Sequence, residues 1–306
     1  MFGKLLVPID GSELAEAALP YAEELAGRLG SAVVLLQVCE LESERTSHKR
    51  QFYMSRLAEI VERGVREYRM LARRSESEEI GVESVMVVGN PAEEIIDYAE
   101  TKGIGLIIMA THGRSGIRRW TVGSVADKVL RGASIPVALI RAGKTRPVVR
   151  EKGMLTKALL PLDGSEVGEA ALPYVEDLAV RLKTEVTILQ VVEPKYFVMG
   201  AEPWVYTPPY WPEWLESMKE SARTYLAGIE QRLKAKGVVA SSRIETGAAA
   251  EQIMEVAEQV DADVIAMSTH GRSGIARWAL GSVADRVLYY GNIPLLLVRA
   301  RQDVST

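Results

Sequence analysis

Two stretches of the sequence are close copies of each other and carry residues suited to binding an anion. ATHGRSGIRRWTVGS occupies residues 110–124, and STHGRSGIARWALGS occupies residues 268–282. Each ends in a Gly-Ser pair that opens a helical pattern, SVADKVL or SVADRVL. Glycine lets backbone N–H groups approach an anion closely, and the unpaired N–H groups of a helix start favour negative charge. A phosphate group is therefore the expected ligand.

The serines of these Gly-Ser pairs also have a purely structural interpretation. Ser124 stands three residues before Asp127, which is the S-x-x-D spacing of a capping box. Ser282 and Asp285 repeat that spacing. In a capping box the serine satisfies only its own helix. The residues alone leave phosphate binding and helix capping equally open.

Two aspartates follow the first apolar run of each copy. VPIDGS carries Asp10 and LPLDGS carries Asp163, each before a Gly-Ser pair at a helix entrance. An aspartate in such a turn often bonds its own backbone. A turn role is therefore the alternative to a ligand role.

Further side chains of the copied stretches are candidates for the same chemistry. Each stretch holds a histidine, a tryptophan and an arginine directly after its first glycine: His112, Trp120 and Arg114 in the first, and His270, Trp278 and Arg272 in the second. The histidines are open to phosphate contact or to structural hydrogen bonding. The arginines are expected phosphate neighbours, and the tryptophans are expected to pack rather than to stack on a base.

The copying extends over nearly the whole chain. Residues 5–38 and 158–191 are identical at 21 of 34 positions, and residues 111–142 and 269–300 at 21 of 32. The offset between the copies grows from 153 to 158 residues, so the second copy has five more residues between its second and third predicted strands. The repeated unit is a whole domain, because it is too long for a solenoid repeat.

Short apolar runs alternate with helical patterns in both copies. In the first copy these runs are KLLVPI, AVVLLQV, VESVMVV, GLIIMA and IPVALIR. Nearly continuous Val, Ile and Leu between helices indicates parallel strands that are covered on both faces. We therefore predict an α/β fold with two tandem, doubly wound domains, each with a five-stranded parallel sheet of the Rossmann-like kind. Pro20 and Pro173 fall inside the first helix of each copy and predict a kinked or broken helix start.

The fold predicts where a ligand should bind. In open sheets of this kind, ligands bind beyond the carboxyl ends of the strands, where the strand order reverses. The PIDGS turn, the end of LLQV and the copied glycine stretch should converge at that edge.

Length, charge and cysteine content limit the class of protein. A chain of 306 residues suits two domains, and we expect 1–142 and 154–306 with a polar linker at 143–153. The net charge of −4 argues against a general nucleic-acid binder. No apolar run approaches the ~18 residues of a membrane span. Cys39 is the only cysteine and the N-terminus has no signal-peptide pattern, so we expect a cytoplasmic protein.

The arrangement of these motifs resembles the universal stress protein family. The ATP-binding branch of that family has G-x2-G-x9-G-[ST] after the fourth strand and an aspartate at the end of the first. The resemblance covers both copies nearly end to end, including VPIDGS or LPLDGS and the closing IPVALIR or IPLLLVR. Ala110 and Ser268 stand where the family pattern has its first glycine.

The resemblance implies one nucleotide site in each copy. In the family the aspartate contacts ribose, the end of the second strand meets adenine through its backbone, and the glycine stretch with its serine holds phosphates. In the first copy the implied set is Pro8, Ile9, Asp10, Val38, Met109, Ala110, His112, Gly113, Arg114, Gly123, Ser124 and Val125. In the second copy it is Pro161, Leu162, Asp163, Val191, Met267, Ser268, His270, Gly271, Arg272, Gly281, Ser282 and Val283.

The resemblance implies a regulatory or sensor protein of the stress response that binds ATP, ADP or AMP, with Mg²⁺ arriving on the nucleotide. The alternative is a scaffold of the same fold that binds no nucleotide. Catalysis has the weakest support. GKT at 143–145 lacks the glycine of a P-loop, and no G-x-S-x-G elbow occurs. Any ATP hydrolysis should therefore be slow.

The resemblance also implies pairing through the last strand of each domain. IPVALIR and IPLLLVR are apolar edge strands, which associate readily. We expect the two domains to pair inside one chain as a pseudo-dimer, while a homodimer and a protein partner stay open.

The copies differ around their third strands. Asn90-Pro91 predicts a helix cap, whereas the second copy has Ala248-Ala249. The second copy also inserts EPKYFVMGAEPWVYTPPYWPEW at 193–214, which is open to three interpretations: a lid, a partner-binding surface, or a stiff loop that seals the sheet edge. Because both differences border the second site, we expect two sites of unequal affinity.

Overall fold

The computed structural model describes nine segments of the chain, namely residues 1–39, 44–73, 80–111, 122–141, 153–193, 197–198, 205–206, 211–270 and 280–300. The first copy, called repeat one below, contains β1 (Lys4–Pro8), η1 (Ala15–Ala18), α1 (Leu19–Leu29), β2 (Ala32–Cys39), α2 (Glu44–Leu71), β3 (Val82–Val88), α3 (Pro91–Thr101), β4 (Leu106–Ala110), α4 (Ser124–Gly132) and β5 (Val137–Ile140), where η marks a 3₁₀-helix.

The second copy, called repeat two, has the same order of elements with one addition. It contains β6 (Lys157–Pro161), η2 (Gly168–Ala171), α5 (Leu172–Leu182), β7 (Glu185–Val192), β8 (Phe197–Val198), β9 (Val205–Tyr206), α6 (Trp211–Ala235), β10 (Ala240–Thr246), α7 (Ala249–Gln259), β11 (Val264–Ser268), α8 (Ser282–Tyr290) and β12 (Leu295–Val298). The addition is the two-stranded sheet of β8 and β9, which pair antiparallel within the aromatic insert.

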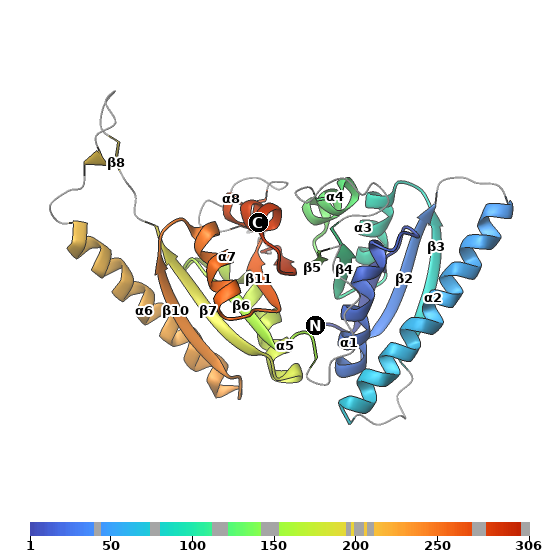
Figure 1. Cartoon of the computed structure of the whole chain (residues 1–306), viewed down its shortest axis with the longest axis horizontal. Coiled ribbons are helices and arrows are strands. Elements are labelled where there is room, and N and C mark those ends of the chain that lie inside the picture. Colours follow the sequence, from blue (N-terminus) through green and yellow to red (C-terminus); the bar gives the residue numbers. More distant parts are fainter. Residues whose placement is uncertain are drawn as a thin grey trace, which may run out of the picture.

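The main sheet runs through both repeats. Its strand order is β10-β7-β6-β11-β12-β5-β4-β1-β2-β3, and Figure 1 shows the two halves side by side with α2 and α6 on the outer flanks. Within each repeat the strands are parallel, and the order reverses next to the first strand, between β1 and β4 or between β6 and β11. The predicted doubly wound fold with two tandem domains is confirmed.

Helices cover both faces of the sheet, and this explains the apolar strands. Leu5, Leu6 and Val7 of β1 are fully buried although consecutive side chains point to opposite faces. Leu5 and Val7 belong to a core cluster with α1 and α2, and Leu6 belongs to a second cluster with α3 and α4. Each cluster continues into repeat two, so the repeats share their cores. None of the described helices is long and apolar enough to span a membrane.

The first helix of each repeat has the broken start that its proline predicts. A short 3₁₀-helix, η1 or η2, precedes α1 or α5, and Pro20 or Pro173 occupies the first turn of the α-helix that follows. Proline is tolerated there because the first N–H groups of an α-helix have no partner inside the helix. The chain thereby passes from the end of the first strand through a 3₁₀-helix into the α-helix.

The two repeats meet where their last strands pair. β5 and β12 lie antiparallel, with Leu295 opposite Leu139 and Leu297 opposite Val137. The predicted pairing of the apolar last strands inside one chain is thus present. The side chains of Leu139, Leu295 and Leu297 are each only 1% exposed, so this junction is part of the common core.

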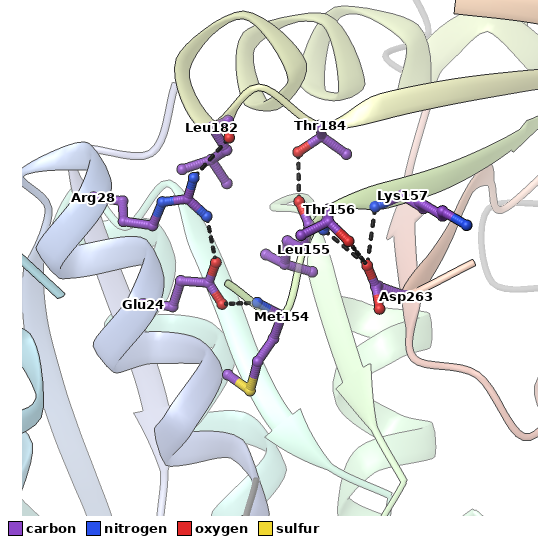
Figure 2. A network of polar contacts seen from close by, with 9 residues as sticks. All are labelled: Glu24, Arg28, Met154, Leu155, Thr156, Lys157, Leu182, Thr184 and Asp263. Carbon is purple, nitrogen blue, oxygen red and sulfur yellow. Dashed lines mark hydrogen bonds and ion pairs between the residues drawn. The ribbon is translucent and has the colours of Figure 1, made fainter. Parts of the chain in front are cut away.

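Polar contacts between α1 and α5 repeat the same two-fold arrangement. Arg28 Nη2 donates to the carbonyl of Leu182 at 2.7 Å, and Arg181 Nη2 donates to the carbonyl of Leu29 at 2.5 Å. Figure 2 shows Glu24, which is fully buried, between Arg28 and the start of repeat two. Its carboxylate accepts from Arg28 Nη1 and from the Met154 N–H, both at 2.7 Å. Repeat two is therefore anchored to α1 directly after the linker.

The start of β6 is held by a second carboxylate. Asp263 Oδ2 accepts from the Thr156 N–H at 2.8 Å, the Thr156 hydroxyl at 2.6 Å and the Lys157 N–H at 2.9 Å (Figure 2). These bonds fix the first residues of repeat two against the loop that precedes β11. Of the predicted linker, only Gly153 lies within the described residues.

Candidate functional site

A pocket of about 280 Å³ lies in repeat one at the carboxyl ends of β1, β2 and β4, where the sequence predicts the ligand. Its other wall is the start of α3 and of α4. The predicted residues that line it are Pro8, Ile9, Asp10, Val38, Met109, Ala110, Gly123, Ser124 and Val125. The remaining predicted residues of this copy, His112, Gly113 and Arg114, lie outside the described residues, as does Trp120.

Several lining residues were not predicted from the sequence: Ala15, Leu36, Pro91, Ile95, Thr111 and Ala126. Leu36 was accessible to prediction, since it stands two residues before Val38 and therefore faces the same side of β2. Ile95 lies one turn after the predicted cap at Asn90-Pro91. Its contribution depends on how α3 packs over the sheet, which no local pattern reports.

The walls of the pocket are largely apolar. Ile9, Leu36 and Met109 are almost fully buried, and Ile95 closes the pocket from α3. Among the described lining residues, Asp10 alone carries a charge. Apolar walls with few polar groups are typical of sites that bind small organic molecules.

Asp10 sits in a tight turn between β1 and η1. Its Oδ1 accepts from the Ser12 N–H at 2.9 Å and from the Ser12 hydroxyl at 2.6 Å. The Ser12 hydroxyl oxygen in turn accepts from the Ala15 N–H at 3.2 Å. Gly11 between them has φ of +81°, a conformation that favours glycine. The turn role that was the alternative for this aspartate is therefore present, and ribose binding by Asp10 stays a prediction.

The start of α4 gives a clear answer on helix capping. The N-cap is Gly123, whose N–H donates to the Thr111 carbonyl at 2.6 Å, and Ser124 is the first helical residue. The Ser124 hydroxyl makes no hydrogen bond to any residue that the structure describes. The Asp127 carboxylate instead accepts from Arg131 Nε at 3.0 Å. The capping-box interpretation of Ser124 and Asp127 is wrong, because the helix begins one residue earlier than that box requires.

The geometry at α4 suits an anion. In an α-helix the first N–H groups have no carbonyl partner inside the helix. Those of Ser124, Val125 and Ala126 stand beside the pocket that these residues line. The helix dipole adds partial positive charge at the same end. The pocket therefore combines an apolar cleft with an electropositive helix start.

Repeat two brings the equivalent described residues together at the same edge of its own half of the sheet. Pro161 ends β6 and is followed by Leu162 and Asp163, Met267 and Ser268 end β11, and Val191 lies near the end of β7. Asp163 Oδ1 accepts from the Ser165 N–H at 3.0 Å and the Ser165 hydroxyl at 2.6 Å, as Asp10 does with Ser12.

The start of α8 repeats the geometry of α4. Gly281 is the N-cap of α8 and donates its N–H to the Thr269 carbonyl at 2.8 Å. Ser282 and Val283 open the helix, so Ser282 is not a capping residue either. Gly271, Arg272 and Trp278 lie outside the described residues.

The second site differs from the first in its polar contacts. The Ser268 hydroxyl, in the place of Ala110, accepts from the His270 N–H at 3.3 Å. The Thr269 hydroxyl and His270 Nδ1 are 2.9 Å apart. Nε2 of the same ring is buried and makes no hydrogen bond to a described residue. These side chains thus structure the beginning of the glycine stretch itself.

The helix after the third long strand, α3 in repeat one and α7 in repeat two, is capped by a different side chain in each repeat. In repeat one the Asn90 side chain accepts from the Ala92 N–H at 3.3 Å, as the sequence predicts. In repeat two the Glu193 carboxylate, from the end of the β7 segment, accepts from the Ala249 N–H at 2.7 Å. A negative charge therefore borders the second site where the first has a neutral amide.

The model of the universal stress protein family matches residues 1–141 and 154–299. A universal stress protein of Methanocaldococcus jannaschii is 30% identical over 158 residues, which covers 46% of this chain and 96% of that protein. A tandem relative from Mycolicibacterium smegmatis, also a universal stress protein, is 26% identical over 310 residues and covers 97% of both chains. The crystal structure of a universal stress protein from Archaeoglobus fulgidus has a TM-score of 0.66 at 20% identity, covering 98% of this chain and 97% of that one.

Proposed function

Because this chain belongs to the universal stress protein family, we propose that it binds an adenine nucleotide, with ATP as the expected ligand, and serves as a regulatory or sensor protein in a stress response. The observation that carries the proposal is the pocket of repeat one, which joins an apolar cleft to the free N–H groups of α4. The matching residues of repeat two form the second proposed site.

Each part of a nucleotide has a counterpart in this pocket. A flat adenine ring would lie in the part of the pocket that Ile9, Val38 and Ile95 line. The Asp10 carboxylate would accept from ribose hydroxyl groups. Phosphates would meet the N–H groups that begin with Ser124, and the helix dipole favours their charge.

The size of the pocket agrees with this assignment. Its volume of about 280 Å³ is close to the lower end of the range for small-molecule sites, about 300–1,000 Å³. It suits the nucleoside part of the ligand. The phosphates would extend beyond it. Gly113 and Arg114, which the family resemblance assigns to the phosphates, lie outside the described residues.

A scaffold that binds no nucleotide is the second candidate. The observation that favours it is the residue at the first glycine position of the family motif. Ala110 places a methyl group on the pocket wall, and the Ser268 hydroxyl is already engaged with the His270 N–H. The two candidates make opposite predictions for binding of ATP to the purified chain.

The variant Gly113→Val with Gly271→Val is expected to lose ATP binding while it stays folded. Valine adds a branched side chain where the backbone must come within hydrogen-bond distance of a phosphate, and it resists the positive φ that such loops often need. We expect a destabilisation of at most ~1–3 kcal/mol, the usual range for a strained site. Calorimetric titration with ATP, with and without Mg²⁺, measures the affinity, and circular dichroism verifies the fold.

A matched control is Gly3→Val with Gly81→Val, because open space surrounds both of these glycines and neither has a positive φ. This control should bind ATP as the wild type does. Undiminished ATP affinity in the folded loop variant would disprove phosphate binding by the glycine stretches. No measurable affinity in the wild type would favour the scaffold.

A further inference from the structure

One arginine joins the first turns of the two helices at which phosphate is proposed to bind. Arg131, in the last turn of α4, places Nε 3.0 Å from both carboxylate oxygens of Asp127. Its Nη2 lies 3.4 Å from Oδ1 of Asp285 in the other repeat. Asp127 is in the first turn of α4, and Asp285 is in the first turn of α8. A single guanidinium group therefore touches both helix starts.

The pairing of β5 and β12 holds this arginine in place. It brings α4 and α8 to either side of the junction, as Figure 1 shows. Arg299 donates to the backbone carbonyl of Arg131, and Arg141 donates to the carbonyl of Leu288 on α8. Repeat two thus holds the backbone of Arg131 through Arg299 and receives its side chain at Asp285.

This bridge is not duplicated, although the repeats are. The position of repeat two that corresponds to Arg131 is Tyr289, at the same offset of 158 residues that relates Asp127 to Asp285. The phenol of a tyrosine cannot neutralise a carboxylate. Among the described residues, Arg131 is therefore the positive charge that both first-turn aspartates share.

The charge of these aspartates matters to an anion that binds at the same helix starts. The backbone N–H groups of Asp127 and Asp285 donate to the carbonyls of Gly123 and Gly281, so both residues lie directly behind the free N–H groups. A carboxylate in the first turn competes with a phosphate for the positive end of the helix dipole. A cation that neutralises the carboxylate removes part of this repulsion.

We propose that Arg131 is a positioning residue for both nucleotide sites and couples them. This inference rests on the proposed function. A phosphate bound at α4 draws the guanidinium toward Asp127 and leaves Asp285 less compensated, so ATP at one site weakens ATP binding at the other. Sharing one positive charge between two anion sites therefore gives negative cooperativity.

The test measures the site of repeat two after a change in repeat one. In the full-length Gly113→Val chain only the second site remains, and Arg131→Gln is added to it. We expect the Kd for ATP to rise about two- to fivefold at low salt, the size of a first-turn charge effect. The effect should shrink in ~1 M salt, because exposed charges are then screened. Arg131→Lys keeps the charge and should largely preserve the affinity.

Arg286→Gln is the matched control. Arg286 follows Asp285 directly on α8, carries the same charge, and pairs with Glu251 at 2.7 Å within its own repeat. Its loss should change the affinity less than about twofold, because the pair is exposed and screened. Adding Asp285→Asn to the Arg131→Gln chain should restore binding, since it removes the uncompensated carboxylate.

The outcomes separate this inference from the proposed function. Absence of ATP binding in both the wild type and the Gly113→Val chain overturns both. If Arg131→Gln leaves the ATP affinity unchanged, the coupling alone is overturned. The coupling is also overturned if Arg131→Gln lowers the ATP affinity but neither salt nor Asp285→Asn changes this loss. In a chain with both sites intact, Arg131→Gln should also abolish the negative cooperativity of the ATP titration. Thermal melts of every variant confirm that the strand junction is intact.

Discussion

Asp10 and Asp163 occupy turns in which a single carboxylate oxygen accepts two hydrogen bonds from the serine two residues on. These bonds shape the passage from the first strand to the 3₁₀-helix of each repeat. The carboxylate group also borders the pocket in repeat one. A structural role and a proposed ligand role therefore fall on the same side chain of Asp10, and substitutions must be chosen to separate them.

Asp10→Asn should separate them. An amide oxygen can still accept both Ser12 bonds, which lose only their charge, so the free energy of unfolding should fall by less than about 1 kcal/mol. ATP affinity should fall about tenfold, because a charge-assisted bond to ribose becomes a neutral one. Asp10→Ala should in addition destabilise the chain by about 1–2 kcal/mol. Urea denaturation and ATP titration, both in the Gly271→Val background, measure the two quantities. Wild-type affinity in the Asn variant would rule out the ribose role.

The sequence predicted the strand ends of the pocket and the start of α4, but not the part of the wall that α3 forms. Met109 could be found because a strand brings consecutive side chains to known faces, and Val125 because it follows the Gly-Ser pair at the start of α4. Ile95 was missed because its position depends on the docking of α3. The capping box failed for a smaller reason: the S-x-x-D pattern fixes a spacing, and an N-cap shifted by one residue, to Gly123, removes the bond.

At the scale of elements, α3 and α7 begin in different ways. Asn90 caps α3 from the adjacent position, and Pro91 follows in the first turn. The Ala248 N-cap of α7 has no side chain that can accept a bond, and Glu193 supplies one from 56 residues away. The local cap was predictable from Asn90-Pro91. The distant one was not, because only the folded chain brings Glu193 to the helix.

The cap from Glu193 can be tested by a rescue. Glu193→Ala should destabilise the chain by about 0.5–1 kcal/mol, because a helix start loses its acceptor. Ala248→Asn places an acceptor at the N-cap, as repeat one has. In the chain with both substitutions, it should remove most of the destabilisation that Glu193→Ala causes. Chemical denaturation of the four chains of this cycle gives the coupling energy. Additive changes in the two substitutions would show that Glu193 does not act as the cap.

At the scale of the whole molecule, two parallel sheets have become one sheet of ten strands. The apolar character of IPVALIR and IPLLLVR predicted that the last strands would be covered, and each covers the other. The reciprocal bonds of Arg28 and Arg181 were not predictable, because their acceptors are backbone carbonyls of the opposite repeat. Such contacts depend on the angle at which the two halves dock rather than on any local pattern.

The junction should hold the halves together without the linker. If a protease site is inserted into residues 143–152 of the full chain and then cut, we expect both fragments to elute together at the size of the intact 33.6 kDa chain. The paired strands and two continuous cores make this contact resemble a permanent interface, which is larger and more apolar than a transient one.

Leu297→Asp should break this association after cleavage. Its side chain is 1% exposed and its backbone pairs with Val137, so a carboxylate there would be buried without a partner at a cost of several kcal/mol. Arg28→Ala with Arg181→Ala should weaken the complex less, because it removes polar bonds and leaves the apolar strands paired. Size-exclusion chromatography and analytical ultracentrifugation of the cleaved chains distinguish these cases. Fragments of the cleaved wild type that separate at micromolar concentration would mean that the linker, rather than the shared sheet, keeps the two sites in one molecule.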